Sequence, residues 1–462
     1  MDEIARNSSF VLPNNVPIPN GFGIGTSIST TGGVDFGNPF FQDLGQNGRR
    51  CISCHLPTAG WGITPPQVKE IFELTQGGKL DDGFGLGAIF RTVDGSNSPL
   101  ADVSTLSKRR AAYSMLLNRG LIRIGLPIPA TAEFELVAVD DPYGFASATE
   151  LSLFRRPLPT ANIKFLSTVM WDGREVVPGQ TIHFDLSNQS NDATTGHAQG
   201  NPIDNATRES IVAFEEALFF AQTRDNQAND LTDAGAKGGP TTLAAQDFYI
   251  GINDNFGDCI DPICHTVGAA LGTGARGAPF TPVVFNIYDA WANASGHGKT
   301  AEERKSVARG QALFNTFPIP ISGVSGINDE AAFGAPTSFV GSCTTCHDSP
   351  NAGDHSVVAP LNIGLVDASR RTPDMPLYTL RNKTTGQTVQ VTDPGRALIS
   401  GKWKHIGRFK GPILRGLAAR APYFHNGLAA DLDAVIDFYN TRFSLNFTRQ
   451  QHNDLVAFLS VL

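Results

Sequence analysis

The sequence predicts a mainly α-helical chain that folds as two units with long loops and an inserted segment. Its 462 residues are too many for one ordinary hydrophobic core. Apolar residues recur at helical spacing in 300–317, and two further helical patterns occupy 432–462. The 48 glycines and 29 prolines interrupt regular structure, so we expect loops over much of the remaining chain.

Composition along the chain indicates where the units begin and end. Residues 1–40 are rich in Gly, Ser, Asn and Pro, which predicts an irregular N-terminal arm. The first unit covers 41–297 and includes a helix that begins at the paired prolines of 65–74. Its last part, about 225–297, is rich in Gly and Asp and is interpreted as an insertion. The second unit covers 298–462.

The charge and hydropathy of the chain argue against two classes of partner. A net charge of −8 and a pI near 5.7 do not suit nucleic acid, which needs clustered Lys and Arg. No apolar stretch approaches the roughly 18 residues of a membrane-spanning helix, so we expect no membrane span. The opening residues, MDEIARNSSF, have neither the basic nor the apolar region of a secretory signal. The chain is therefore either cytosolic or has lost its signal.

The six cysteines form three close pairs, and a histidine directly follows the second cysteine of each pair. Only ten histidines occur in the whole chain, so this repeated arrangement needs a chemical cause. The three groups are Cys51, Cys54 and His55; Cys259, Cys264 and His265; and Cys343, Cys346 and His347. Each group is therefore a candidate cofactor or metal site.

Two of the groups, CISCH (51–55) and CTTCH (343–347), have the C-x-x-C-H spacing of a covalent haem c site. The two thiols form thioethers with the haem, and the histidine becomes the proximal ligand of the iron. A redox C-x-x-C pair would follow a strand, and zinc would require two distant motifs to share one ion. Because haem c is attached after export, the motifs predict a periplasmic or extracellular protein whose signal peptide was removed.

The third group, CIDPICH (259–265), has four residues between its cysteines instead of two. With His265 as proximal ligand, it could bind a third haem through Cys259 and Cys264. A disulfide in an exported protein and a metal clip are the alternatives. The sequence leaves this choice open.

Four phrases outside these motifs resemble the bacterial di-haem cytochrome c peroxidase superfamily, which includes the methylamine-utilisation enzyme MauG. They are FRRPLPTANIKFLSTVMWDGRE (154–175), LNIGLVD (361–367), DPGRALISGKWKHIGRFKGPILRGLAARAPYFHNG (393–427) and LDAVIDFY (432–439). The resemblance implies a mainly α-helical protein with two cytochrome c-like haem domains. The first 40 residues and 225–297 lie outside the resemblance.

The resemblance implies different roles for the two haems. The N-terminal haem on His55 would react with the substrate, and the C-terminal haem on His347 would transfer electrons. Trp171 falls where the family has an aromatic residue between the haems, which implies an electron relay; the alternative is a buried core tryptophan. Asn162 occupies the position of a calcium ligand, but Arg420 replaces a smaller family residue, so the resemblance allows calcium without requiring it.

The first haem site departs from the family in two ways. No histidine lies between His55 and His183, and Ile71 stands where the family has a histidine that leaves the iron on activation, so we expect a five-coordinate or water-bound iron. The stretch HAQGNPIDNATRE places His197 at the family's distal glutamine, and it ends in Glu209 near the position of a catalytic glutamate. An imidazole can accept a proton from bound peroxide and return it to the leaving oxygen. His197 is therefore the first catalytic candidate and Glu209 the second; a surface-loop histidine is the alternative.

The sixth ligand of the C-terminal haem is left open among three residues. Tyr439 lies seventeen residues after Pro422, where the family usually has methionine. MauG has tyrosine in this place, and a phenolate stabilises high oxidation states of iron. Met375 would instead raise the reduction potential and favour plain electron transfer. His355 is the third candidate.

Together these features predict a peroxidase-like multihaem c-type oxidoreductase, in which peroxide or O₂ reacts at the N-terminal haem. Electrons would arrive through the C-terminal haem from a small cytochrome c, a cupredoxin or an organic substrate. Two other functions fit the same motifs. One is a MauG-like or oxygenase-type oxidation of an organic or protein substrate, and the other is electron transfer without catalysis.

Overall fold

The computed structural model describes residues 10–83, 85–255 and 280–462 of the chain. Over these residues the protein is 33% helical and 17% strand, so the prediction of a mainly α-helical fold was wrong. The fold combines helices with five small antiparallel sheets. Sequence reasoning missed these strands because they are short, at most eight residues long, so no alternating apolar pattern extends over many residues.

Ten α-helices occur in the described residues, and three of them match the helical patterns expected near the start and the end of the second unit. None of the described helices is both long and apolar enough to cross a membrane. The helices are α2 (Pro65–Thr75), α3 (Leu106–Ala112), α4 (Ser114–Arg119), α5 (Ile182–Gly196), α6 (Asn205–Glu216), α7 (Gly239–Ala244), α8 (Lys299–Thr316), α9 (Ala397–Ser400), α10 (Leu432–Phe443) and α11 (Arg449–Ser460).

The strands form one four-stranded sheet, one three-stranded sheet and three two-stranded ribbons. The four-stranded sheet has the order β2 (Pro17–Asn20), β3 (Gly23–Ser29), β8 (Leu218–Asp225), β9 (Asn229–Asp230). The three-stranded sheet has the order β13 (Thr388–Val391), β12 (Leu377–Asn382), β6 (Phe134–Asp140). The ribbons pair β1 (Val11–Leu12) with β4 (Val34–Asp35), β5 (Ile122–Leu126) with β7 (Leu151–Arg155), and β10 (Ile319–Ser322) with β11 (Ser338–Gly341).

Two of these sheets join segments that are far apart in the sequence. Strand β3 comes from the segment expected to be an irregular arm, yet its residues pair with β8 from Gly23 opposite Asp225 to Ser29 opposite Leu218. Strand β6 of the first half pairs with β12 of the second half. The two halves of the chain therefore share backbone hydrogen bonds as well as side-chain contacts.

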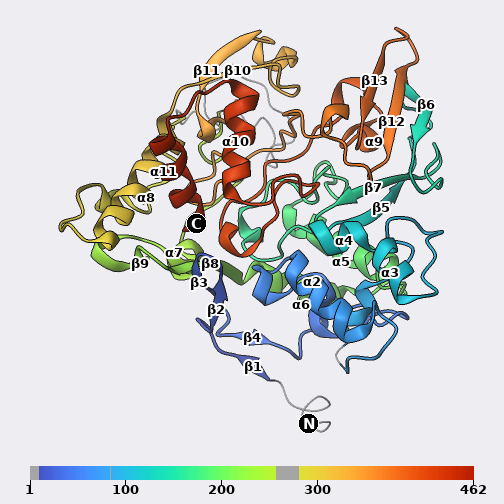
Figure 1. The fold of residues 1–462 in the computed structure, drawn as a ribbon, viewed down its shortest axis with the longest axis horizontal. Helices are drawn as coiled ribbons and strands as arrows, with labels where there is room; N and C mark the ends of the chain where they lie inside the picture. The colour runs from blue at the N-terminus through green and yellow to red at the C-terminus, as the bar shows by residue number, and fades with distance from the viewer. Residues whose placement is uncertain (1–9, 84, 256–279) are drawn as a thin grey trace.

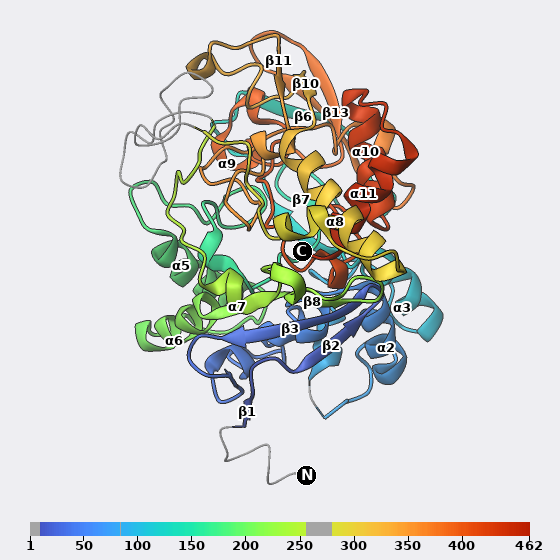
Figure 2. The ribbon, with the colours of Figure 1, turned by 90° about the vertical axis from the view of Figure 1, so that its left-hand side faces the viewer.

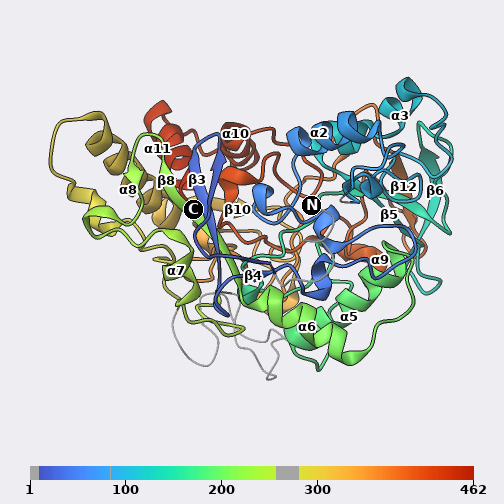
Figure 3. The same cartoon turned by 90° about the horizontal axis from the view of Figure 1, so that it is seen from below.

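Three helices of the second half, α8, α10 and α11, lie close together in the molecule. In Figure 1, α8, α10 and α11 lie together, and α2, α3 and α4 lie on the other side. Figure 2 shows β2, β3 and β8 below α8 and α11, and Figure 3 shows α5 beside α6 along another edge. The close packing of α8 on α11 depends on Gly310, because a Cβ there would lie 1.9 Å from the Asp454 carbonyl oxygen.

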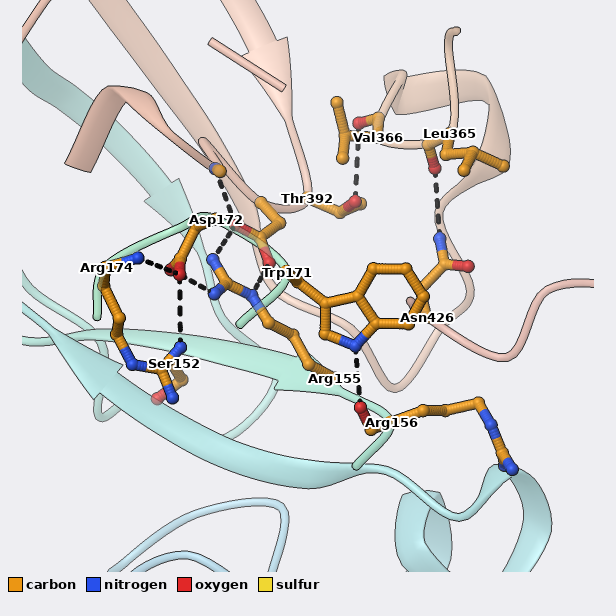
Figure 4. Close-up of polar contacts among 12 residues, drawn as sticks. Ser152, Arg155, Arg156, Trp171, Asp172, Arg174, Leu365, Val366, Thr392 and Asn426 are labelled. Carbon is orange, nitrogen blue, oxygen red and sulfur yellow. Dashed lines mark hydrogen bonds and ion pairs between the residues drawn. The ribbon is translucent and has the colours of Figure 1, made fainter. Parts of the chain in front are cut away.

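A buried arginine at the end of β7 connects the halves. The Nε of Arg155 donates to Oδ2 of Asp393 at 2.7 Å, and its second terminal nitrogen donates to Oδ1 at 2.9 Å. The remaining terminal nitrogen of Arg155 pairs with Asp172, which directly follows Trp171 (Figure 4). All three charged side chains are almost completely excluded from solvent. One guanidinium therefore binds two buried carboxylates from different parts of the chain, and Arg174 adds a second cation beside Asp172.

Replacing Arg155 should destabilise the protein strongly. In the Arg155→Met variant, Asp393 would remain buried without its cation and Asp172 would keep only Arg174, so we expect the free energy of unfolding to fall by about 3–5 kcal/mol. Arg381→Met is the matched control, because the pair of Arg381 with Glu135 is solvent-exposed and should change stability by about 1 kcal/mol or less. Urea unfolding measures both values. Equal losses in the two variants would contradict the role given to Arg155.

Candidate functional site

The two C-x-x-C-H motifs fold into the same local structure. Cys51–Ser53 and Cys343–Thr345 each form one 3₁₀ turn. The histidine N–H then donates to the carbonyl of the first cysteine, at 3.1 Å in the first motif and 3.2 Å in the second. The four cysteines of these motifs carry free thiols, which covalent attachment of a haem requires.

Both motif histidines are held in one orientation. The Nδ1 of His55 lies 3.2 Å from the carbonyl oxygen of Trp61, and the Nδ1 of His347 lies 2.6 Å from that of Gly353. Because a carbonyl only accepts, Nδ1 carries the proton and Nε2 keeps its lone pair. Burial lowers the pKa of each imidazole to about 4, so both rings are neutral at pH 7. Nε2 of each ring is thus ready to bind iron.

A cavity beside His55 is rich in arginine. It is lined by the motif residues Cys51, Cys54 and His55, by apolar side chains, and by Arg49, Arg50, Arg155, Arg156 and Arg174. Haem carries two propionate carboxylates, which arginine binds well. The lining therefore fits haem c. Iron held there by His55 would supply the redox chemistry of the site.

His197 lines the same cavity, as the resemblance implies. Its Nδ1 lies 3.1 Å from Oδ2 of Asp94, and Asp94 also pairs with Arg49. Burial by itself would raise the pKa of Asp94, but the hydrogen bond from His197 and the charge of Arg49 lower that pKa below its usual value. An ionised Asp94 accepts the Nδ1 proton of His197 and leaves Nε2 as the free ring nitrogen. Asp94 lies far from His197 in sequence, and no motif indicated it.

The expected second candidate, Glu209, lies elsewhere. Its carboxylate is 2.8 Å from Nε2 of His183 on an exposed surface, and Glu209 does not line the cavity. Glu215, further along α6, lines the cavity instead. Its Oε2 is buried without a hydrogen-bond partner in the described part of the chain, and burial raises its pKa to about 8. Sequence reasoning missed Glu215 because it has the same helical spacing as core residues.

The last expectation for the first site is that no second histidine binds the iron, because Ile71 stands where the family has a histidine ligand. Ile71 is packed in an apolar cluster with Val68 and Phe72 on α2. Among the residues that line the described cavity, His55 and His197 are the two histidines. This arrangement is compatible with an iron that has no second protein ligand.

A second cavity, beside His347, is almost entirely apolar. Tyr439 and His355 line it, whereas Met375 lies outside its lining, in a separate apolar cluster with Met115 and Phe154. Burial raises the pKa of the Tyr439 phenol above its usual value, so a bound metal would be needed to hold it as phenolate. As a candidate sixth ligand of the C-terminal haem, Tyr439 therefore fits this geometry better than Met375.

Trp171 and Lys410 line both cavities. The indole N–H of Trp171 donates to the carbonyl of Arg156 at 2.8 Å (Figure 4), and the backbone N–H of Lys410 donates to the carbonyl of Trp171 at 2.9 Å. On the side of the second cavity, the ring of His425 lies 6.2 Å from the Trp171 ring, centroid to centroid. The tryptophan therefore forms part of the wall between the two cavities, with its N–H satisfied.

Two expectations concern other cofactors. The amide of Asn162 is used by β8, since its Nδ2 donates to the Phe220 carbonyl at 2.8 Å and its Oδ1 accepts the Phe220 N–H at 3.0 Å. Nearby, the Arg420 guanidinium donates to the carbonyls of Ile413 and Arg415. Calcium at Asn162 therefore stays an expectation without support from this geometry. The CIDPICH group, with Cys259, Cys264 and His265, lies outside the described residues.

Comparison with known proteins identifies relatives over part of the chain. No model of a known protein family matches it. Cytochrome-c peroxidase IdrP2 of Denitromonas iodatirespirans is 31% identical over 132 residues, which are 26% of this chain and 36% of that protein. Cytochrome-c peroxidase IdrP1 of Pseudomonas sp. (strain SCT) is 30% identical over 140 residues, with the same coverage of 26% and 36%. The chain thus spans about a third of the length of the curated relatives that it matches.

A solved structure of a MauG-like protein associated with microbial copper homeostasis aligns with 99% of this chain and 94% of its own, at 16% identity and a TM-score of 0.38. The two sequence matches agree with the resemblance that the motifs imply: part of the chain is similar to bacterial cytochrome-c peroxidases.

Proposed function

We propose that this protein is a multihaem c-type oxidoreductase that reduces peroxide at a haem held by His55. A second haem, held by His347, supplies the electrons. The observation that carries this proposal is the asymmetry of two cavities that share one wall. His197 lines only the cavity beside His55, Tyr439 lines only the cavity beside His347, and Trp171 lines both.

The protein side chains would move the proton that peroxide cleavage requires. His197, oriented by Asp94, has its Nε2 free to take a proton from one peroxide oxygen and return it to the other, which leaves as water. The positive charge that His197 acquires is balanced by Asp94, whose carboxylate is 3.1 Å from Nδ1. Arg50, which lines the cavity and whose Nε has no hydrogen-bond partner among the described residues, would hold a haem propionate.

Electrons would reach the first cavity from the second through Trp171. The donor would be a small cytochrome c, a cupredoxin or an organic molecule that meets the protein near the second haem. We further propose a periplasmic location, because haem c is attached outside the cytosol. The cytochrome-c peroxidase relatives support this function, although they match only part of the chain.

Replacing His197 tests the proton transfer. We expect His197→Gln to lower the turnover of peroxide with a reduced small cytochrome c by about 10²–10⁴-fold, with haem content unchanged. His183→Gln is the matched control, because His183 is a partly exposed histidine outside both cavities. Turnover is measured by oxidation of the cytochrome after addition of hydrogen peroxide. Equal rates in wild type and His197→Gln, or a ferric spectrum with no high-spin haem, would contradict the proposal.

Glu215 would keep its proton at neutral pH, since burial raises its pKa to about 8 from a usual 4.5. The unfolded chain releases this proton above pH 4.5, so the contribution of Glu215 to stability is present below pH 4.5 and is lost as the pH rises towards 8. Relative to Glu215→Gln, the wild type should lose up to about 1.4 kcal/mol of stability per pH unit in this range. Urea unfolding at several pH values measures the difference. Parallel pH profiles would show that Glu215 is already ionised when buried.

A MauG-like oxidation of an organic or protein substrate is the second candidate function, and Tyr439 favours it. If Tyr439 ligates the second haem, Tyr439→Met should raise the reduction potential of that haem, because a thioether favours the reduced iron more than a phenolate does. Tyr423→Phe, which also removes a phenol lining this cavity, should leave the potential close to that of the wild type. Redox titration of the visible bands measures both. An unchanged potential in Tyr439→Met would exclude Tyr439 as ligand.

A further inference from the structure

Three buried side chains converge beside the second haem-binding turn. Asp254, Asp348 and His355 each offer one ligand atom, and these atoms all lie within 4.8 Å of one another. The two carboxylates are 0% exposed and the imidazole is 3% exposed. Nδ1 of His355 lies 2.8 Å from Oδ2 of Asp348. The cluster includes none of the cysteines or histidines of the C-x-x-C-H motifs.

The backbone around this cluster is fixed by hydrogen bonds between two segments. Oδ1 of Asp348 accepts the N–H of Ser356 at 2.7 Å, and the Ser356 carbonyl accepts the N–H of Gly251 at 2.9 Å. The side-chain amide of Asn253 donates to the Asp348 carbonyl at 3.2 Å. Asp254 is thus held against the turn that follows His347, and the three ligand atoms are positioned before any ion binds.

The charge of the neighbourhood also points to a cation. Asp354 is 1% exposed, and its Oδ1 accepts no hydrogen bond from the described residues. With Asp254 and Asp348, this makes three buried carboxyl groups in one place. The nearby buried ammonium, Lys410, donates to the carbonyl of Thr168 at 2.6 Å. Buried carboxylates are costly unless a cation compensates them, and one lysine cannot neutralise all three.

We propose that Asp254, Asp348 and His355 bind one divalent transition-metal ion. A single imidazole nitrogen with two carboxylate oxygens suits Mn²⁺ or Zn²⁺, whereas Ca²⁺ and Mg²⁺ prefer oxygen ligands alone. Asp354 or water would complete the coordination. The ion ties the chain at Asp254 to the second haem-binding turn. The site does not depend on the reaction at the first haem.

Metal analysis of the full-length holoprotein tests the site. The protein is treated with a chelator, incubated with excess MnCl₂ or ZnCl₂, desalted, and analysed by mass spectrometry for metal per haem. In the wild type we expect one added Mn²⁺ or Zn²⁺ ion per protein chain. In Asp254→Asn and Asp348→Asn we expect less than about a tenth of an ion per chain. His183→Gln is the control for adventitious binding, because His183 contacts two glutamates on the surface, and it should keep the full equivalent.

Two outcomes would overturn the proposal: a wild type without the additional equivalent, and variants that retain it. Since Asp348 is adjacent to a haem ligand, its substitution can impair folding, so Asp254→Asn and His355→Gln are compared with circular dichroism as a fold control. Bound Mn²⁺ also gives a direct readout in the unmodified protein, because its six-line solution spectrum in electron paramagnetic resonance disappears on binding. A full six-line signal from one equivalent of Mn²⁺ mixed with the wild type, together with no bound Zn²⁺, would likewise overturn it.

Discussion

The buried ion pairs of Arg155 hold the two halves of the chain, and the cavities beside His55 and His347, against each other. Arg155 ends β7 in the first half and binds Asp393 of the second half, and it also binds Asp172, the residue after Trp171. Removing any member of this cluster would destabilise the protein, because a buried charge would lose its partner. Because Asp172 is fixed in this way, Trp171 is kept in the wall between the cavities, and its N–H is directed to the Arg156 carbonyl. The pairing of β6 with β12 adds a second, independent connection.

Around this fixed wall, the two cavities provide different environments. Each has a neutral histidine with Nδ1 bonded to a backbone carbonyl, so the two motif histidines are held in the same way. The other residues that line the cavities differ. The first cavity has several arginines, a histidine oriented by Asp94 and a protonated Glu215, whereas the second is apolar and contains a phenol. Proton-coupled chemistry suits the first environment, and storage of electrons or oxidising equivalents suits the second.

Sequence reasoning located the covalent motifs and the residues at fixed distances from recognisable phrases. His197, Trp171 and Tyr439 all line the cavities. It failed where contacts between distant segments determine which residues form a sheet or line a cavity. The short strands carry no long periodic pattern, so the fold was taken as mainly helical. Asp94 reaches His197 across about a hundred residues, and Glu215 differs from Glu209 only in the face of α6 on which it lies. The Asp254 cluster joins segments that no motif connects.

The central claim is that Trp171 connects the two haem sites, and rapid-mixing spectroscopy tests it most directly. The fully reduced holoprotein is mixed with hydrogen peroxide, and the oxidation of each haem is followed at its own absorption band. The account predicts that Trp171→Phe slows oxidation of the C-terminal haem while the N-terminal haem still reacts at the wild-type rate. Trp403→Phe, which changes a tryptophan outside both cavities, should leave both rates unchanged. Oxidation of the C-terminal haem at the wild-type rate in Trp171→Phe would contradict the account.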